Sequence, residues 1–334
     1  MNLTQLRFIV AIADANLNIT HAAARVHATQ PGLSKQLKQL EDELGLQLFT
    51  RRARSISAIT DAGEKVLRHA RVILAEAANI RALAANLRGE SAGVLEIATT
   101  HTQARYVLPR LIAELKQGFP QVAVKVLPGS DAEALAHYAN GEADLTLVSS
   151  ALAPPPADLA LPVYRWERVA LVPRSHPLAL LKRPPTLADL TGYPLISYET
   201  SRDPGSSLQR AFAEAGLSPE ISITAAGADL IKTYVRNGLG VGILAEMAIE
   251  PGDRDLLVLS LVGRLPTCTT WLLLRRDRVL REYTDALIAL LIPAVDGGDV
   301  RRALREELRL ALDPAPWTAR VDLHLHPPLG DFQI

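Results

Sequence analysis

A run of five polar side chains, residues 99–103, has the composition of an anion-binding site: Thr99, Thr100, His101, Thr102 and Gln103. The run follows an apolar segment, 94–98, that has the pattern of a strand, and it precedes a segment typical of a helix. Hydroxyls, an amide and the backbone N–H groups of a helix start can hold an anion without a formal positive charge. Ordinary helix capping needs one such residue, not five in a row. The run therefore predicts a small anion site just after the strand.

A second set of polar side chains shares one face of a helix predicted from about Pro31 to Leu44. The apolar face of this helix carries Leu33, Leu37, Leu40 and Leu44. Its opposite face carries Gln30, Ser34, Lys35, Lys38 and Gln39. Glutamine, serine and lysine can contact base edges or phosphates in a DNA major groove. The alternative is a small helical bundle whose polar face is simply solvated.

Arginines follow this helix at the distance expected of a β-wing. Arg51, Arg52 and Arg54 precede the alternating segment 55–60. Arginines in such a position contact phosphates or enter the minor groove. Their presence favours a DNA-binding surface over a solvated bundle.

Two earlier helices must position this recognition helix. Residues 3–12 have an apolar face at helical spacing, and residues 21–26, rich in alanine, form a second helix capped by Asn18 or Thr20. Small side chains let two helices cross closely. Pro31 sits in the first turn of the third helix, where its missing N–H costs no hydrogen bond. The segment 1–60 therefore predicts a winged helix-turn-helix.

A long helix is predicted from Thr60 to about Leu87. Thr60 has the type of a cap, and an apolar stripe recurs at alternating spacings of four and three residues. The stripe consists of Val66, Ala70, Ile73, Ala77, Ile80, Ala84 and Leu87. Such a helix needs a partner, either its own chain or the same helix of a second subunit.

Beyond Gly93 strands and helices alternate, which predicts two α/β lobes. In the first half the expected strands are 94–98, 122–126 and 144–148, and the expected helices are 104–117 and 131–140. In the second half the expected strands are 169–172, 221–223, 240–244 and 271–275, and the expected helices are 207–215, 229–237 and 280–292. A ligand would lie in the cleft at the carboxyl ends of the strands.

Composition excludes several classes of protein. The 334 residues are too many for one ordinary domain of roughly 150 residues. The formal net charge is zero, although residues 1–60 carry seven basic and four acidic side chains, an excess of +3. One cysteine, Cys268, excludes internal disulfides and a cysteine-rich zinc site. The chain shows no pattern of a signal peptide or membrane span, so we expect a cytoplasmic protein.

The N-terminal sequence resembles the DNA-binding domain of LysR-type transcriptional regulators. The resemblance is dense from Ala22 to Arg51 and includes Thr29-Gln30-Pro31, Ser34-Lys35 and the run from Leu40 to Gly45. It implies binding of double-stranded promoter DNA, dimerisation through the long helix, a tetramer, and RNA polymerase as a further partner. The residues implied to contact DNA are Thr29, Gln30, Pro31, Ser34, Lys35, Lys38, Arg51 and Arg52.

Two later segments resemble the CysB-like subgroup of these regulators, which control sulfur assimilation. They are the run from Thr99 to Pro109 and the run from Asp229 to Gly242. The resemblance covers residues 1 to about 292 and implies an effector such as sulfate, thiosulfate or acetylserine. It carries Thr100, Thr102 and Gln103 over as anion ligands. Ser149 stands where the subgroup has threonine, and Trp166 matches as a wall of the pocket or as interdomain packing.

The sequence departs from the subgroup between residues 199 and 205. Asp203 stands about where a hydroxyl ligand is expected, beside a new arginine, Arg202. We expect Arg202 to supply a bidentate anion contact. Asp203 would repel an anion unless it is paired, so the effector can differ from the subgroup's usual one.

The expected organisation is an α+β multidomain chain. It has a winged helix-turn-helix (1–60), a linker helix and hinge (61–92), a two-lobed effector domain like periplasmic binding proteins (93–298), and a C-terminal helix and tail (299–334). Lobe I takes 93–165 and 268–298, and lobe II takes 166–267. The tail helix is expected over 299–312, with an exposed remainder. His324 and His326 could suggest a metal, but we assign neither metal nor cofactor.

Two other functions compete with a regulator. A solute-binding protein, or a sensor of that kind with a non-sulfur effector, has the same two-lobed fold, but the N-terminal helix-turn-helix argues against transport. An enzyme needs a nucleophile or an acid–base pair, and His101 is the only evident general base in the cleft. No glycine-rich phosphate loop or metal-ligand spacing occurs, so we expect no catalytic residues.

Overall fold

The computed structural model describes residues 1–52, 55–151 and 153–319. The chain divides into two compact units. The first unit contains Met1–Glu90 together with the short segment Asp277–Arg281, and the second contains Ser91–Arg276 and the chain from Glu282 onward.

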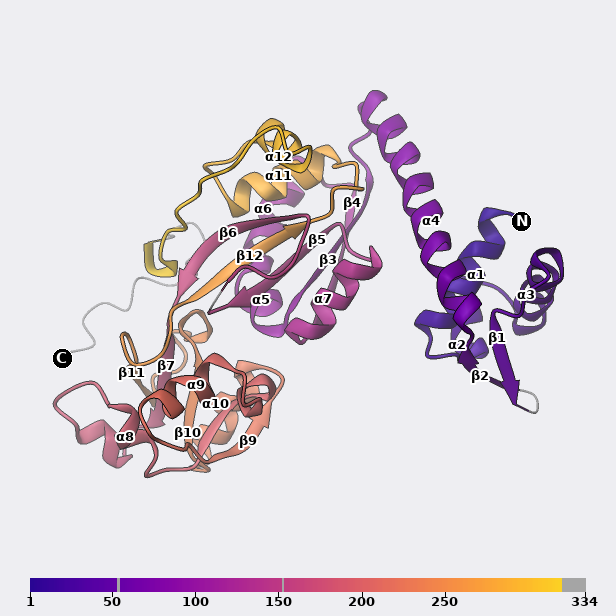
Figure 1. The fold of residues 1–334 in the computed structure, drawn as a ribbon. Helices are drawn as coiled ribbons and strands as arrows, with labels where there is room; N and C mark the ends of the chain where they lie inside the picture. Colours follow the sequence, from indigo (N-terminus) through magenta and orange to yellow (C-terminus); the bar gives the residue numbers. More distant parts are fainter. Residues whose placement is uncertain (53–54, 152, 320–334) are drawn as a thin grey trace. The chain divides into compact units, whose positions relative to one another are not determined.

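The first unit is a winged helix-turn-helix followed by one long helix, as the sequence predicts (Figure 1). Its elements are α1 (Leu3–Asp14), α2 (Ile19–Arg25), α3 (Gln30–Leu44), β1 (Phe49–Arg52), β2 (Ser55–Ile59) and α4 (Asp61–Leu87). The helices α1 to α3 pack around a core that contains Ile9, Ile12, Leu33, Leu37 and Leu40. The strands β1 and β2 pair antiparallel as the wing.

Capping side chains fix where these helices begin. Asn18, rather than Thr20, caps α2 by accepting hydrogen bonds from two backbone N–H groups. Thr29 caps α3 by accepting from the N–H of Gly32, so the helix begins at Gln30, one residue earlier than expected. Thr60 caps α4 in the predicted way.

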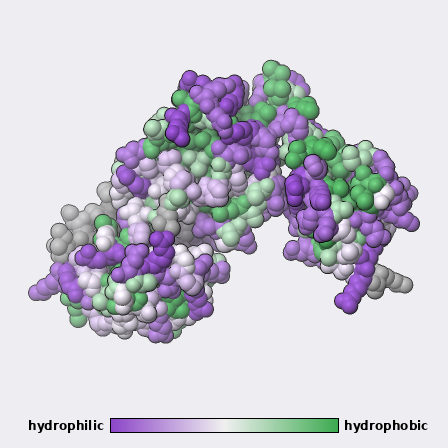
Figure 2. Space-filling model, in the orientation of Figure 1, coloured by the Kyte–Doolittle hydropathy of each residue, from purple (hydrophilic) through white to green (hydrophobic). Residues whose placement is uncertain are grey.

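The helix α4 is 27 residues long and starts against the wing. A Cβ on Gly63 would lie 2.0 Å from the carbonyl oxygen of Leu48, so only glycine allows this close approach. Further along, α4 leaves large apolar side chains exposed. They are Val72, Ile73, Ile80, Leu83 and Leu87, and green surface follows this helix in Figure 2.

The second unit contains two five-stranded sheets, each with helices packed on it. The first sheet consists of β3 (Gly93–Thr100), β4 (Val122–Gly129), β5 (Leu145–Ser150), β6 (Leu159–Trp166) and β12 (Cys268–Leu274). Its helices are α5 (His101–Tyr106), α6 (Leu108–Gly118), α7 (Asp131–Asn140), α11 (Glu282–Leu291) and α12 (Gly297–Leu304). We call this part lobe I.

Lobe II is built around the other sheet. Its strands are β7 (Arg168–Pro173), β8 (Leu195–Tyr198), β9 (Ile221–Ala225), β10 (Val241–Ala245) and β11 (Leu256–Ser260). Its helices are α8 (Leu187–Leu190), α9 (Ser207–Glu214) and α10 (Ala228–Arg236), and short 3₁₀ turns include η1 (Pro177–Leu180), η2 (Glu199–Arg202) and η3 (Glu246–Ala248). Together the two lobes confirm the predicted fold class.

Strand order explains how the lobes share one chain. The order in lobe I is β4-β3-β5-β12-β6, and in lobe II it is β11-β7-β10-β8-β9. The strands β3, β4 and β5 are parallel, whereas β12 runs antiparallel to both β5 and β6. The chain thus leaves lobe I after β6, forms lobe II, and returns to lobe I, where β12 inserts between β5 and β6.

Several elements differ from the sequence predictions. The helix expected at 104–117 is two helices, because the chain breaks at Val107 before Leu108-Pro109. The strands β6, β8 and β11 were not expected. The helix expected over 299–312 ends at Leu304.

The end of the described chain runs beside lobe I, and most of residues 313–319 are exposed, whereas Trp317 is buried. The turn η4 (Trp317–Ala319) follows a segment whose Pro316 bridges to Arg165 of β6, and Trp317 is only 6% exposed. Trp317 is thus the residue of this segment that departs from the expected exposed tail. His324 and His326 lie outside the described residues.

Candidate functional site

The predicted DNA-contacting side chains lie on the exposed face of α3 and on the wing. Thr29, Gln30, Pro31, Lys35 and Lys38 are exposed, and Ser34 is half-buried. Arg51 and Arg52 are exposed on β1, whereas Arg54 lies outside the described residues. The hydroxyl of Thr29 already accepts the N–H of Gly32, so its first role is to cap the recognition helix.

Sequence reasoning missed Glu41, which ties the wing to α3. One carboxylate oxygen of Glu41 accepts the N–H groups of Leu48 (2.8 Å) and Phe49 (3.3 Å). The other oxygen accepts the guanidinium of Arg51 at 3.2 Å. The Glu41 side chain is 10% exposed, so its bonds to the two backbone N–H groups are largely shielded from water and fix the position of β1, whereas the Arg51 guanidinium is 48% exposed.

The second unit contains a cavity of about 360 Å³ that is lined by residues of both lobes. Lobe I contributes hydroxyl, amide and indole groups, and lobe II contributes further hydroxyls and a guanidinium. The lobe I set is Thr100, His101, Thr102, Gln103, Ser149, Ser150 and Trp166. The lobe II set is Arg168, Tyr198, Thr200, Ser201, Ser206 and Ser207.

The structure therefore brings five of the six predicted effector residues to one cavity and leaves out the sixth. Arg202 does not line it. Its guanidinium is exposed and donates to the carbonyls of Ile221 and Ser222, because the turn η2 directs the side chain toward β9. The prediction that Arg202 contacts an anion there is wrong. Asp203 is also turned aside and accepts the N–H of Gly205.

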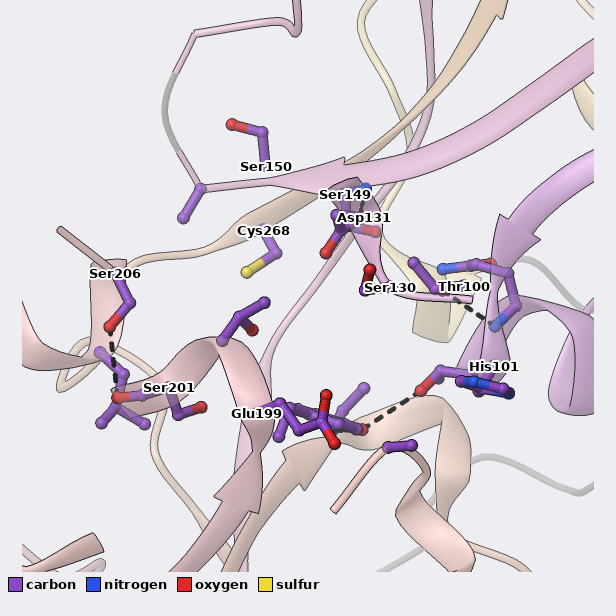
Figure 3. Close-up of a pocket in the computed structure, with 18 of the residues that line it drawn as sticks. Thr100, His101, Ser130, Asp131, Ser149, Ser150, Glu199, Ser201, Ser206 and Cys268 are labelled. Carbon is purple, nitrogen blue, oxygen red and sulfur yellow. Dashed lines mark hydrogen bonds between the residues drawn. The ribbon is translucent and has the colours of Figure 1, made fainter. Parts of the chain in front are cut away.

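The predicted threonines serve different purposes. Thr100 ends β3 and caps α5, with its hydroxyl 3.4 Å from the N–H of Gln103. Thr102 is buried and donates to the hydroxyl of Tyr198 at 3.4 Å, a bond that joins lobe I to lobe II. Figure 3 shows Thr100 and His101 on one side of the cavity and Ser201 and Ser206 on another.

The amide of Gln103 is held from several directions. Its Nε2 donates to the hydroxyl of Thr270 at 3.1 Å and lies 3.7 Å from the sulfur of Met247. Its carbonyl oxygen accepts the hydroxyl of Tyr164. Thr270 in turn lies 3.1 Å from the hydroxyl of Ser149. Gln103 and Ser149 are thus two ends of one hydrogen-bonded group at the cavity wall.

Trp166 and Arg168 also present hydrogen-bond donors to the cavity. Within the described residues the buried indole N–H of Trp166 has no hydrogen-bond partner. The guanidinium of Arg168 lies 5.8 Å from the centre of the Trp166 ring and donates to the hydroxyl of Ser207 at 2.8 Å. A ligand oxygen could satisfy the indole, because a buried unpaired donor is costly.

Carboxylates also line the cavity, which the sequence analysis did not anticipate. They belong to Asp131, Glu133 and Glu199. Asp131 accepts the N–H of Ser149 at 3.2 Å, and burial raises the pKa of its carboxyl group. Hydrogen bonds from Ser130 lower the pKa of Glu133. Asp131 and Glu133 lie in the first turn of α7, which follows β4, and Glu199 begins η2, directly after β8. The rule that ligands meet the carboxyl ends of strands could therefore have found them.

The comparisons with known proteins agree with this architecture. Residues 3–64 match the family "Bacterial regulatory helix-turn-helix protein, lysR family", and residues 88–296 match "LysR substrate binding domain". The regulator CysB of Burkholderia cenocepacia is 38% identical over 92% of this chain and 98% of its own length. SsuR of the same species is 37% identical over 92% of this chain and 99% of its own length.

A solved structure is similar as well. The cofactor-binding domain of the Cbl transcriptional regulator is 36% identical, covers 64% of this chain and 94% of its own, and superposes with a TM-score of 0.59. All of these relatives are regulators rather than enzymes. The chain belongs to the LysR family of DNA-binding transcriptional regulators and, within it, to the CysB-like group.

Proposed function

We propose that this regulator binds promoter DNA through α3 and the wing, and that the cavity between its lobes binds the effector that controls it. The observation that carries the proposal is the cavity itself, where both lobes present hydroxyl, indole and guanidinium donors. A ligand that touches both lobes stabilises one arrangement of them over others, which is what control by an effector requires. Membership of the CysB-like group supports control of sulfur-metabolism genes.

The DNA-binding role rests on the exposed polar face of α3. Gln30 lies at the N-terminal end of the helix, which in a helix-turn-helix approaches the base edges. We expect Gln30→Ala to weaken promoter binding by about 1–3 kcal/mol and to relax sequence preference. The control is Gln117→Ala, the same change at an exposed position of α6. Equal promoter affinity for the two variants would refute the assignment.

The effector is proposed to be a small sulfur-related anion or an acetylserine-type compound. Hydroxyls and the Trp166 N–H suit oxyanion oxygens, and Arg168 adds the positive charge. The cavity volume favours acetylserine over sulfate, because about 360 Å³ is many times the ~10–15 Å³ that a single water needs. The carboxylate of Asp131 also favours an effector that carries an amino group besides its anionic end.

Calorimetric titration of the full chain tests the effector class. The probes are sulfate, thiosulfate, sulfite, acetylserine and adenosine phosphosulfate. We expect Thr100→Val combined with Thr102→Val to abolish binding while promoter affinity stays largely intact. The matched control is Thr233→Val, at an exposed position of α10. If no probe binds the wild type, a non-sulfur effector becomes the better proposal.

We further propose that α4 pairs with α4 of a second copy, with a tetramer as the final assembly. Its exposed row of apolar residues needs cover, and two symmetric recognition helices suit two half-sites on DNA. We expect Ile80→Asp with Leu87→Asp to yield monomers in sedimentation, whereas Leu180→Asp, an equally exposed leucine on lobe II, leaves the assembly unchanged. Wild-type assembly of the double variant would refute the pairing.

Three finer points remain proposals. The domain boundaries are 1–60, 61–92, 93–298 and 299–334. RNA polymerase is a further partner, since a promoter-bound regulator acts on transcription through it. The working compartment is the cytoplasm, where promoter DNA lies. Within the described residues no helix is long and apolar enough to cross a membrane.

A further inference from the structure

The segment Asp313–Ala319, here called the C-terminal strap, lies along the open edge of the lobe I sheet. The strand β6 is the edge strand, and the N–H of its Arg165 donates to the carbonyl of Ala315 at 3.0 Å. The guanidinium of Arg165 lies 3.5 Å from the carboxylate of Asp313, an exposed pair that adds little. In Figure 1 this gold segment follows α12 and runs beside β6.

One side chain of the strap is buried. Trp317 is 6% exposed, and its ring centre lies 5.1 Å from that of Tyr164 at an interplanar angle of 54°. Tyr164 itself is fully buried. An aromatic pair of this geometry contributes beyond its buried area, so the indole limits where the Tyr164 ring can sit.

Tyr164 connects the strap to the effector cavity without lining it. Its hydroxyl donates to the carbonyl oxygen of Gln103, a lining residue. With that oxygen held, the amide nitrogen keeps one hydrogen for Thr270 and directs the other toward Met247. Sulfur is a weak acceptor, so an effector oxygen can take its place. The orientation of the Gln103 amide therefore depends on Tyr164.

We propose that Trp317 is a positioning residue of the effector site, which acts through Tyr164 on the amide of Gln103. The proposal rests on the proposed function of the cavity. Without Trp317 the ring of Tyr164 gains space, and the bond that orients Gln103 is no longer enforced. The strap thereby sets effector affinity from outside the cavity, with no contact to the effector.

The test is a double-mutant cycle on the full chain. Effector affinity is measured by calorimetry, with sulfate and acetylserine as probes, for the wild type, Trp317→Ala, Tyr164→Phe and the double variant. Because one hydrogen bond is involved, we expect each single variant to bind about 3- to 10-fold more weakly. The double variant should be no weaker than Tyr164→Phe, since both changes break the same connection. Additive effects would overturn the proposal.

Two further variants separate positioning from loss of stability. Leu304→Ala removes a buried side chain from the neighbouring helix α12 and should lower the unfolding temperature without changing effector affinity. Trp317→Phe keeps an aromatic ring on Tyr164 and should restore most of the affinity. If Leu304→Ala weakens binding as much as Trp317→Ala, the role of Trp317 is merely structural and the proposal fails.

A ligand-free measurement separates this proposal from the proposed function. If no probe binds the wild type, the proposed sulfur-related effector class fails. The crystal structure of the Trp317→Ala protein then decides the positioning claim. A turned Gln103 amide would support it, and an unchanged bond between Tyr164 and Gln103 would refute it.

Discussion

The side chain of Glu41 provides the sharpest test of what fixes the wing to α3 in the first unit, here called the DNA-binding unit. In Glu41→Ala the N–H groups of Leu48 and Phe49 lose their acceptor, and both residues are at most 1% exposed. A buried donor left unpaired costs about 1–3 kcal/mol. With two such donors, and with water partly filling the vacated space, the free energy of unfolding should fall by about 2–3 kcal/mol. The pair with half-exposed Arg51 adds less than about 1 kcal/mol.

This loss should be visible in thermal unfolding of the full chain. For a unit of this size 1 kcal/mol corresponds to about 4–8 °C, so we expect the transition of the DNA-binding unit to fall by roughly 10–20 °C. That transition is identified as the one that promoter DNA shifts upward. Promoter affinity should fall as well, since the wing arginines lose their fixed position.

Two variants make the reasoning refutable. Glu41→Gln keeps the one oxygen that both N–H groups share and loses only the ion pair, so it should cost under about 1 kcal/mol. Glu43→Ala removes an exposed carboxylate of the same helix and should change stability by less than about 0.5 kcal/mol. If Glu41→Ala unfolds at the same temperature as Glu43→Ala, the proposed anchor of the wing does not exist.

Two further predictions concern the cavity. Burial raises the pKa of Asp131, so its carboxyl group gains a proton as the pH falls and then repels an anion less. We therefore expect sulfate to bind more tightly at pH 5.5 than at pH 8. Calorimetry should show a weaker pH dependence for Asp131→Asn, and an unchanged dependence would exclude Asp131 as its source. Burial also raises the pKa of the Cys268 thiol to about 11. We therefore expect alkylation of Cys268 at pH 8, followed by mass spectrometry, to be about two orders of magnitude slower than for an ordinary cysteine. A normal rate of alkylation would contradict the burial of this thiol.

The sequence was sufficient for the fold class because hydrophobic periodicity and caps are local signals. The apolar spacing of α3, the cap at Thr60 and the alternation of strands and helices each fix an element without reference to the rest of the chain. The site residues of lobe I were predictable for a similar reason. Thr100 and Ser149 stand at or near the ends of parallel strands, where ligands of open α/β sheets bind.

The lobe II half of the cavity was not predictable in this way. The strand β8 has only four residues, Leu195–Tyr198, too few to show a period. The loop 199–205 was noticed, but nothing in it pointed to Thr200 and Ser201 rather than to Arg202. The direction of the Arg202 side chain depends on the turn η2, for which the sequence carries no clear signal. Trp317 is a single aromatic residue in a proline-rich segment, and its burial depends on an edge strand that lies far from it in sequence.

The insertion of β12 between β5 and β6 has a consequence for the order in which the protein matures during synthesis. Ser150 ends β5 and Cys268 begins β12, so the ribosome must add more than a hundred residues before the lobe I sheet can close. At about 5–20 residues per second this takes roughly ten seconds. Thr270, which holds Gln103 and Ser149, arrives only then, and Trp317 arrives later still. The winged helix-turn-helix, residues 1–60, is thus synthesised long before the sensor is complete, and a chain released early would be able to reach a promoter but not to respond to an effector.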